Sequence, residues 1–179
     1  MPENKIVITG LGVVSSNGIG KNAFFNALFS GASGIKPVSL FDVSALKTRM
    51  AAEATDFSPQ EFLGPKGLRT LDRSTKLVAS AAKMALDDAG LAVTEQNCRD
   101  IGIAIGDTLG SISSISNFDK DALTDGARYV NPALFPNTVI NSPASEVSIK
   151  FNIKGFNATI STGFSAGRDA ISYGLDLLK

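Results

Sequence analysis

Residues 163–167 read Gly-Phe-Ser-Ala-Gly and are the part of the chain whose types and spacing most suggest chemistry. This G-x-S-x-G pattern follows a predicted strand over 157–162 and precedes a predicted helix over 165–178. That context is typical of a nucleophile elbow, a sharp turn that lifts a side chain above a sheet. A hydrolase would use Ser165 as the nucleophile, and a serine needs a base, usually histidine. The chain has no histidine, so a Ser165 enzyme requires a base from another chain. The alternative is that these small residues only allow close packing.

Two other motifs are incomplete. Gly10 and Gly12 follow an apolar run, as in a dinucleotide-binding turn, but the third glycine of that fingerprint is replaced by Ser15. A plain tight turn is the alternative. Ser44 and Lys47 match the S-x-x-K pattern of penicillin-binding enzymes, yet the Ser-Asp-Asn and Lys-Thr-Gly partner motifs are missing. Neither motif therefore defines a site.

The composition excludes several classes of protein. The 179 residues include 17 Lys and Arg, 17 Asp and Glu, one Cys and no His. This balance lacks the basic surplus of a nucleic-acid or membrane-surface binder. Without histidine, and with Cys98 as the only cysteine, no metal cluster is expected, and no cofactor is expected either. Cys98 cannot form an internal disulfide, the polar N-terminus is no leader peptide, and no apolar run could span a membrane. A cytoplasmic location is therefore expected.

The periodicity of apolar residues predicts strands separated by helices. The predicted strands are 5–14, 101–106 and 157–162, and one more short strand is predicted near 49–54. The predicted helices are 21–30, 72–89, 165–178, one short helix within 111–130, and 137–151 with a turn or kink at Pro143. The segment 32–66 is expected to be a long surface loop. The pattern predicts an α/β fold with a central, mostly parallel sheet flanked by helices.

Five stretches, in this order along the chain, carry a resemblance to a known family: IVITGLGVVSSNG, LDRSTKLVASAAKMALDDAGL, IGIAIGDTLGS, NPALFPNTVINSPASEVSIKFNIKG and NATISTGFSAG. Together they resemble the N-terminal part of a β-ketoacyl-acyl-carrier-protein synthase, a condensing enzyme with the thiolase fold. The resemblance covers nearly the whole chain. It implies a single partial domain over 1–179, truncated at its C-terminus, because the family is about twice as long and its active-site histidines and lysine lie in the later half.

The resemblance also implies roles for individual residues. The family's nucleophilic Cys stands in a Thr-Ala-Cys-like sequence, and aligning Thr162 with the family Thr places Phe164 at the Cys position. Phenylalanine has no lone pair with which to attack a thioester, so no catalytic residue is assigned apart from the alternative, Ser165. Leu109, Leu134, Phe135 and Phe164 correspond to acyl-pocket positions, with ordinary core packing as the alternative for each.

The resemblance favours a noncatalytic partner subunit of fatty acid or polyketide biosynthesis, similar to a chain-length factor. Such a chain would pair with an active synthase or bind acyl-carrier protein, as a homodimer or heterodimer. Two alternatives stay open. One is an acyltransferase or condensing enzyme completed by another chain, including an elbow that uses Ser165. The other is a fragment with no separate activity. Whether the chain itself is an enzyme is left undecided.

Overall fold

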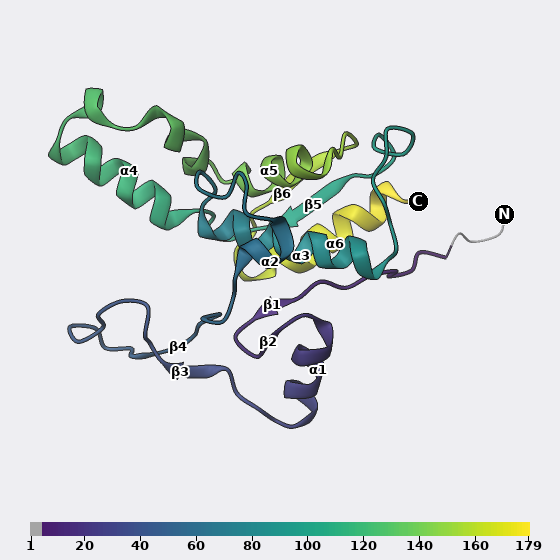
Figure 1. The fold of residues 1–179 in the computed structure, drawn as a ribbon, viewed down its shortest axis with the longest axis horizontal. Coiled ribbons are helices and arrows are strands. Elements are labelled where there is room, and N and C mark those ends of the chain that lie inside the picture. Colours follow the sequence, from purple (N-terminus) through teal and green to yellow (C-terminus); the bar gives the residue numbers. More distant parts are fainter. Residues whose placement is uncertain (1–4) are drawn as a thin grey trace. The chain divides into compact units, whose positions relative to one another are not determined.

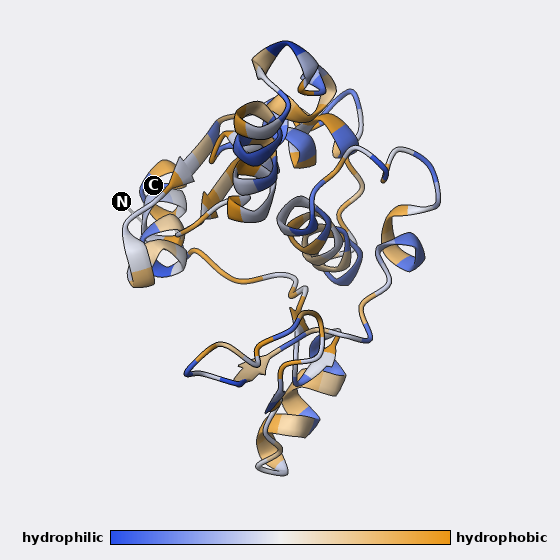
Figure 2. Cartoon of the chain, turned by 90° about the vertical axis from the view of Figure 1, so that its left-hand side faces the viewer, coloured by the Kyte–Doolittle hydropathy of each residue, from blue (hydrophilic) through white to orange (hydrophobic). Residues whose placement is uncertain are grey.

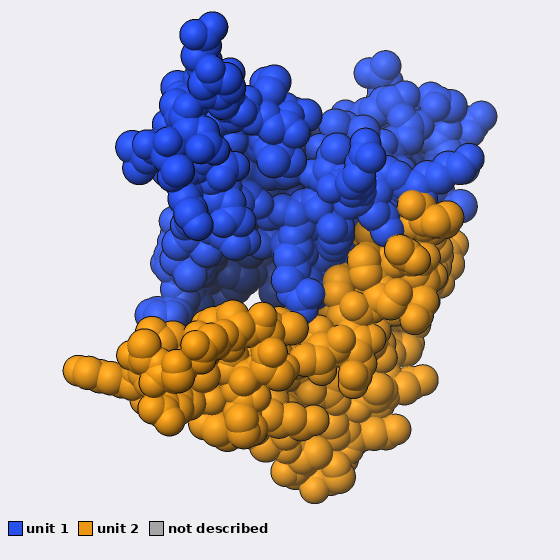
Figure 3. Space-filling model, turned by 60° about the vertical axis from the view of Figure 1, so that its left-hand side comes forward, with its two compact units in different colours: residues 1–8, 66–79, 92–179 blue, residues 9–65, 80–91 orange. Residues whose placement is uncertain are grey.

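The computed structural model describes residues 5–179, which fall into two compact units (Figure 3). Unit 1 contains residues 66–79 and 92–179 together with the described part of residues 1–8, and unit 2 contains residues 9–65 and 80–91. Most of the polar N-terminus considered above, residues 1–4, lies outside the described residues. The single domain over 1–179 stays a prediction. No helix within 5–179 has the length and apolar character to cross a membrane.

A pair of parallel strands forms the centre of unit 1. Strand β5 (Ile103–Gly106) pairs with β6 (Asn157–Ile160), with Ile103 opposite Asn157 and Gly106 opposite Ile160. Helices α5 (Ser142–Phe151) and α6 (Ala166–Leu177) pack against both strands (Figure 1). Both strands were predicted, as was the final helix, because apolar runs bounded by Gly and polar residues mark them in the sequence. The buried apolar residues are Leu68, Ala79, Cys98, Ile103, Ala144, Val147, Ile153, Ala166 and Ala170.

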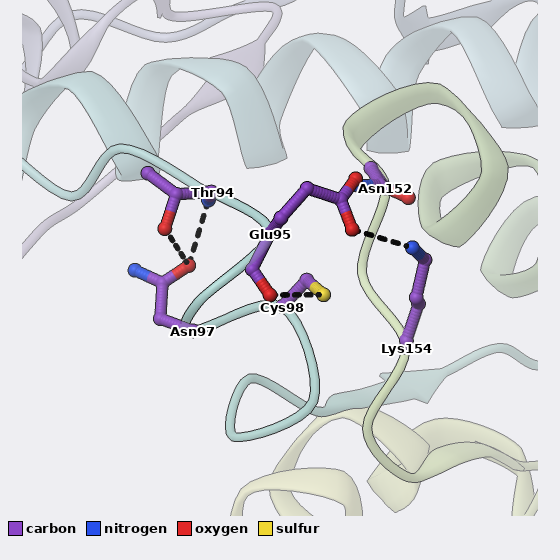
Figure 4. Close-up of polar contacts among 6 residues, drawn as sticks. All are labelled: Thr94, Glu95, Asn97, Cys98, Asn152 and Lys154. Atoms are coloured by element: carbon purple, nitrogen blue, oxygen red, sulfur yellow. Dashed lines mark hydrogen bonds and ion pairs between the residues drawn. The ribbon is translucent and has the colours of Figure 1, made fainter.

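Polar contacts tie the loop before β5 to the loop before β6 (Figure 4). Glu95 accepts hydrogen bonds from Asn152 at 2.8 Å and from Lys154 at 3.1 Å. The backbone N–H of Lys154 also donates to the carbonyl of Cys98 at 2.7 Å. The hydrogen bond from Lys154, followed by that from Asn152, holds the pKa of Glu95 below its usual value. These contacts fix where the two parallel strands begin.

The segment between β5 and α5 is more helical than predicted. Where one short helix was predicted, helix α4 (Ile112–Thr124) has 13 residues, and two 3-10 helices follow it, η1 (Ala127–Tyr129) and η2 (Pro132–Thr138). The Ser- and Asp-rich composition lowers helix propensity, yet α4 packs against η2, and tertiary packing overrides propensity. Pro143 lies in the first turn of α5, where the missing N–H costs nothing, so it starts the helix rather than kinking it. The predicted helix over 137–151 therefore begins only at Ser142.

Helix α3 (Arg73–Asp88) contributes residues to both units. The Oδ1 atom of Asp72 accepts a hydrogen bond from the N–H of Thr75 at 2.8 Å and so caps the start of the helix. Gly90, at φ 61°, follows the helix end, as expected for a residue that leaves a helix in the left-handed conformation. The helices of both units carry hydrophobic and hydrophilic residues together (Figure 2), as amphipathic helices do.

Unit 2 is built from short elements. Two antiparallel pairs, β1 (Val14–Ser15) with β2 (Gly18–Ile19) and β3 (Ile35–Pro37) with β4 (Met50–Ala52), accompany α1 (Lys21–Phe29) and α2 (Pro59–Leu63). Helix α1 and the strand near 49–54 were predicted. The expectation that the rest of 32–66 is a plain loop is wrong, because β4 finds a partner in β3 and Ser58-Pro59 starts a helical turn.

The predicted strand over 5–14 is also wrong, except for Val14. Among the described residues, 5–13 pair with no strand, and Val7 and Ile8 are exposed. Within unit 2, Gly10 and Gly12 instead lie against the backbone of α3, where an added Cβ would come within 2.2 Å of the Ala85 oxygen and 1.9 Å of the Ala81 oxygen. The alanines of α3 therefore allow the close approach of an extended segment.

Candidate active site

The elbow lies where β6 passes into α6, as the sequence predicted. Residues 163–165 form the 3-10 helix η3, and Gly163 has φ 73°, a left-handed conformation that favours glycine. Phe164 follows it and is fully exposed, with a relative exposure of 109%. The turn between β6 and α6 thus presents an apolar ring to the surface, directly before Ser165, the central residue of the G-x-S-x-G pattern.

A second loop lies beside the elbow because the strands are parallel. Both strands end at the same edge, and the N–H of Asp107 donates to the carbonyl of Ile160 at 2.9 Å. Thr108 Oγ1 then donates to the carbonyl of Gly163 at 2.7 Å. Leu109, the next residue, is 65% exposed. The structure therefore brings the loops of two predicted pocket residues, Leu109 and Phe164, to one edge.

The start of α6 lies against the end of β5. A Cβ added to Gly106 would come within 2.2 Å of the Ala166 carbonyl oxygen and 2.4 Å of the Gly167 nitrogen. Since all these neighbours are backbone atoms, only glycine fits. Gly106 therefore allows the close strand–helix approach that sets the height of the elbow above the sheet.

Ser165, the alternative nucleophile, has a carboxylate rather than a base of suitable strength beside it. Its Oγ donates to Asp169 Oδ2 at 2.8 Å, and Thr162 Oγ1 donates to the same oxygen at 2.5 Å. The hydrogen bond from Thr162, followed by that from Ser165, holds the pKa of Asp169 below its usual value. A carboxylate stabilised in this way is a weak base for a hydroxyl proton. Sequence reasoning missed Asp169, although an acidic residue in the first turn of the final helix could have indicated it.

The other two predicted pocket residues contact a different element. Leu134 and Phe135 belong to η2, which packs against α4, and the ring of Phe135 lies 6.0 Å from that of Phe118. Both are partly exposed, at 40% and 57%. None of the four predicted pocket residues is buried, so core packing within the described residues does not account for them.

Unit 2 contains a polar cavity of about 250 Å³. Its lining includes Ser15, Asn17, Lys36 and Glu53. Glu53 accepts hydrogen bonds from the backbone and side chain of Ser39 at 2.9 and 2.8 Å. Charged and amide groups of this kind are unsuited to an alkyl chain. Among residues 5–179 no group of three or more His, Cys, Asp or Glu side chains is arranged to hold a metal ion.

Several known proteins share this fold. The structure of the ishigamide ketosynthase/chain length factor matches with a TM-score of 0.75 and 28% identity, and the match covers 94% of this chain and 44% of that one. A β-ketoacyl synthase from Burkholderia phymatum STM815 matches with a TM-score of 0.78 at 24% identity, covering 96% of this chain and 43% of the other. The latter similarity supports the fold alone, and together these neighbours confirm the α/β, thiolase-like fold class.

Sequence relatives agree. The 3-oxoacyl-[acyl-carrier-protein] synthase 2 of Coxiella burnetii is 37% identical over 97% of this chain and 42% of the relative. The tetracenomycin polyketide synthase ketoacyl synthase alpha subunit of Streptomyces glaucescens is 33% identical over 99% and 43%. The chain thus spans less than half the length of these curated relatives. The family model for the N-terminal domain of β-ketoacyl synthases matches residues 3–179. With this match, and with the elbow in its expected place between β6 and α6, the chain belongs to the β-ketoacyl synthase family.

Proposed function

We propose that the chain is a nucleophile-free β-ketoacyl synthase subunit of fatty acid or polyketide biosynthesis, with a role like that of a chain-length factor. The observation that carries the proposal is Phe164, fully exposed on the elbow between β6 and α6. A phenyl ring forms no thioester, whereas it can occupy the entrance of an acyl tunnel and limit its depth. The whole protein's action is therefore on the tunnel of a partner rather than on the thioester bond.

The remaining groups of the elbow support an inactive site. No histidine occurs in the 179 residues. The Ser165 hydroxyl donates a hydrogen bond to Asp169 but keeps its proton, because the lowered pKa of Asp169 makes that carboxylate a poor base. Within the described residues, the site thus offers neither a reactive thiol nor a base that could activate the serine.

The exposed apolar residues define the surface that would meet an acyl chain. We assign Leu109 and Phe164, on adjoining loops, to the tunnel entrance, and Leu134 and Phe135, on η2, to the pocket wall. Large apolar side chains that gather on adjoining exposed loops mark a surface that a ligand or a partner can cover. No cofactor is required for this role. The partners are an active synthase subunit or acyl-carrier protein, and the location is the cytoplasm.

Acyl transfer tests the proposal directly. The full chain is incubated with acyl-carrier protein that carries a labelled acyl group, and intact mass is measured. We expect no covalent adduct on the wild-type chain. The Ser165→Ala variant serves as the control. An adduct that maps to Ser165 and disappears in that variant would refute the proposal and establish the alternative, a serine-dependent acyltransferase.

Assembly provides a second test. Within the described residues β6 pairs only with β5, which leaves its other edge free, and free strand edges pair with other strands. We propose that this edge pairs across a two-fold axis with a second copy or with the active synthase. Light scattering at micromolar concentration should show a dimer or a complex, weakened by Ile160→Lys but not by Ser172→Lys on the exposed part of α6. A monodisperse wild-type monomer that also fails to bind a synthase would contradict the proposal.

A further inference from the structure

Two hydroxyl groups on either side of Phe164 converge on a single carboxylate oxygen. Thr162 Oγ1 lies 2.5 Å and Ser165 Oγ 2.8 Å from Asp169 Oδ2, and the two hydroxyl oxygens are 3.4 Å apart. The three side chains therefore close a ring of hydrogen bonds around the turn that carries the phenyl ring. Hydrogen bonds to an ionised acceptor are about twice as strong as neutral ones.

This arrangement differs from the usual role of an acidic residue in a first helical turn. Such a carboxylate normally stabilises the helix through the dipole and the free backbone N–H groups. Asp169 instead accepts from side chains that precede α6. From the loop after β5, Thr108 Oγ1 also donates to the carbonyl of Gly163 at 2.7 Å. Hydrogen bonds from two different elements thus restrain the elbow.

We propose that Asp169 is a positioning residue for the elbow. Its carboxylate holds residues 162–165 in one conformation, which keeps Phe164 directed outward and keeps the proton of Ser165 engaged. The inference rests on the proposed function, because an apolar anchor works best when its backbone is fixed before the partner binds. The inference adds that the hydroxyl of Ser165, next to Phe164, serves structure rather than chemistry.

Amide hydrogen exchange in the full chain tests the role of Asp169. We compare the peptide covering 161–171 in the wild type with Thr162→Val, Ser165→Ala and Asp169→Ala. The control is Ser172→Ala, at an exposed serine of the same helix. Loss of the restraint should speed exchange in this peptide about tenfold, because local opening sets exchange rates. The Ser172→Ala rate should equal that of the wild type. Far-UV circular dichroism verifies that each variant is folded.

The hydroxyl variants and one further substitution separate positioning from a helix-dipole effect. Thr162→Val and Ser165→Ala leave the charge of Asp169 in place, so a dipole effect alone predicts no change in their exchange. Asp169→Asn removes the charge but keeps an acceptor oxygen, so positioning predicts slower exchange than in Asp169→Ala. Wild-type exchange in both hydroxyl variants, or equal exchange in the Asn and Ala variants, would overturn the inference. Acyl transfer to Ser165 of the wild-type chain would overturn the proposed function and the claim that this hydroxyl serves structure alone. The positioning role of Asp169 is tested separately, since the exchange measurement involves neither a partner nor a substrate.

Discussion

Replacing Gly106 with alanine should destabilise the fold at the base of the elbow. The new Cβ would lie 2.2 Å from the Ala166 oxygen, 2.3 Å from its carbonyl carbon and 2.4 Å from the Gly167 nitrogen. These are backbone atoms, so α6 must move by about 1 Å or more to restore contact distances. Overpacking of this kind costs about 1–3 kcal/mol, and we expect the upper end because no side chain can rotate away.

Gly174 provides a matched control on the same helix. It lies within α6, and a Cβ added there meets nothing within 4 Å. Gly174→Ala should therefore stabilise the chain by about 0.5–1 kcal/mol through helix propensity. In urea unfolding followed by circular dichroism, the two variants should differ by about 3.5–4 kcal/mol, or about 2 M in midpoint for a slope near 2 kcal/mol/M. A Gly106→Ala midpoint equal to that of the wild type would refute the close approach.

Three further predictions concern other parts of the chain. In the Phe164→Cys variant, the new thiol should react with iodoacetamide at least about tenfold faster than Cys98, because residue 164 is exposed whereas Cys98 is buried and reacts only after local opening. Equal rates by peptide mapping would contradict the exposed position of residue 164 on the elbow. Gly12→Ala should lower the unfolding midpoint, because its Cβ would meet the α3 backbone at 1.9 Å; an unchanged midpoint would contradict that contact. The pKa of Glu95 is lowered mainly by the hydrogen bond from Lys154. The ionised Glu95 side chain therefore stabilises the fold above its unfolded-state pKa, and this stabilisation is lost as the pH falls through its folded-state pKa. The stability difference between wild type and Glu95→Gln should therefore shrink on acidification, and a difference that grows would show the opposite sign.

Local signals predicted most of the fold of unit 1. Asp72 before α3, Pro143 at the start of α5 and the glycines around β5 each act within a few residues, so the sequence alone reveals them. The run 5–14 failed as a strand because a strand also needs a partner, which no local pattern supplies. The hairpin of β3 and β4 was missed for the same reason, since Ile35 and Ala52 meet across a loop.

The sequence predicted the candidate site only in part, as it did the fold. Phe164 could be placed on the elbow because strand, glycine and helix signals are contiguous there. Asp169 could not, because it meets Thr162 from seven positions away only after η3 has turned the chain. Nor could spacing show that Leu109 adjoins the elbow, because that follows from the parallel pairing of β5 with β6. It could not show either that η2, which carries Leu134, packs against α4.

The parallel pairing of β5 with β6 also has a consequence for the order of events during synthesis. Ile103 pairs with Asn157, 54 positions later in the chain. Closing a loop of that size costs about 3.5 kcal/mol in chain entropy from its length alone. At about 5–20 residues per second, β5 leaves the ribosome roughly 3–11 s before β6. During that interval the edge of β5 lacks its partner strand, so the elbow forms late. A chaperone can bind the nascent chain during the same interval.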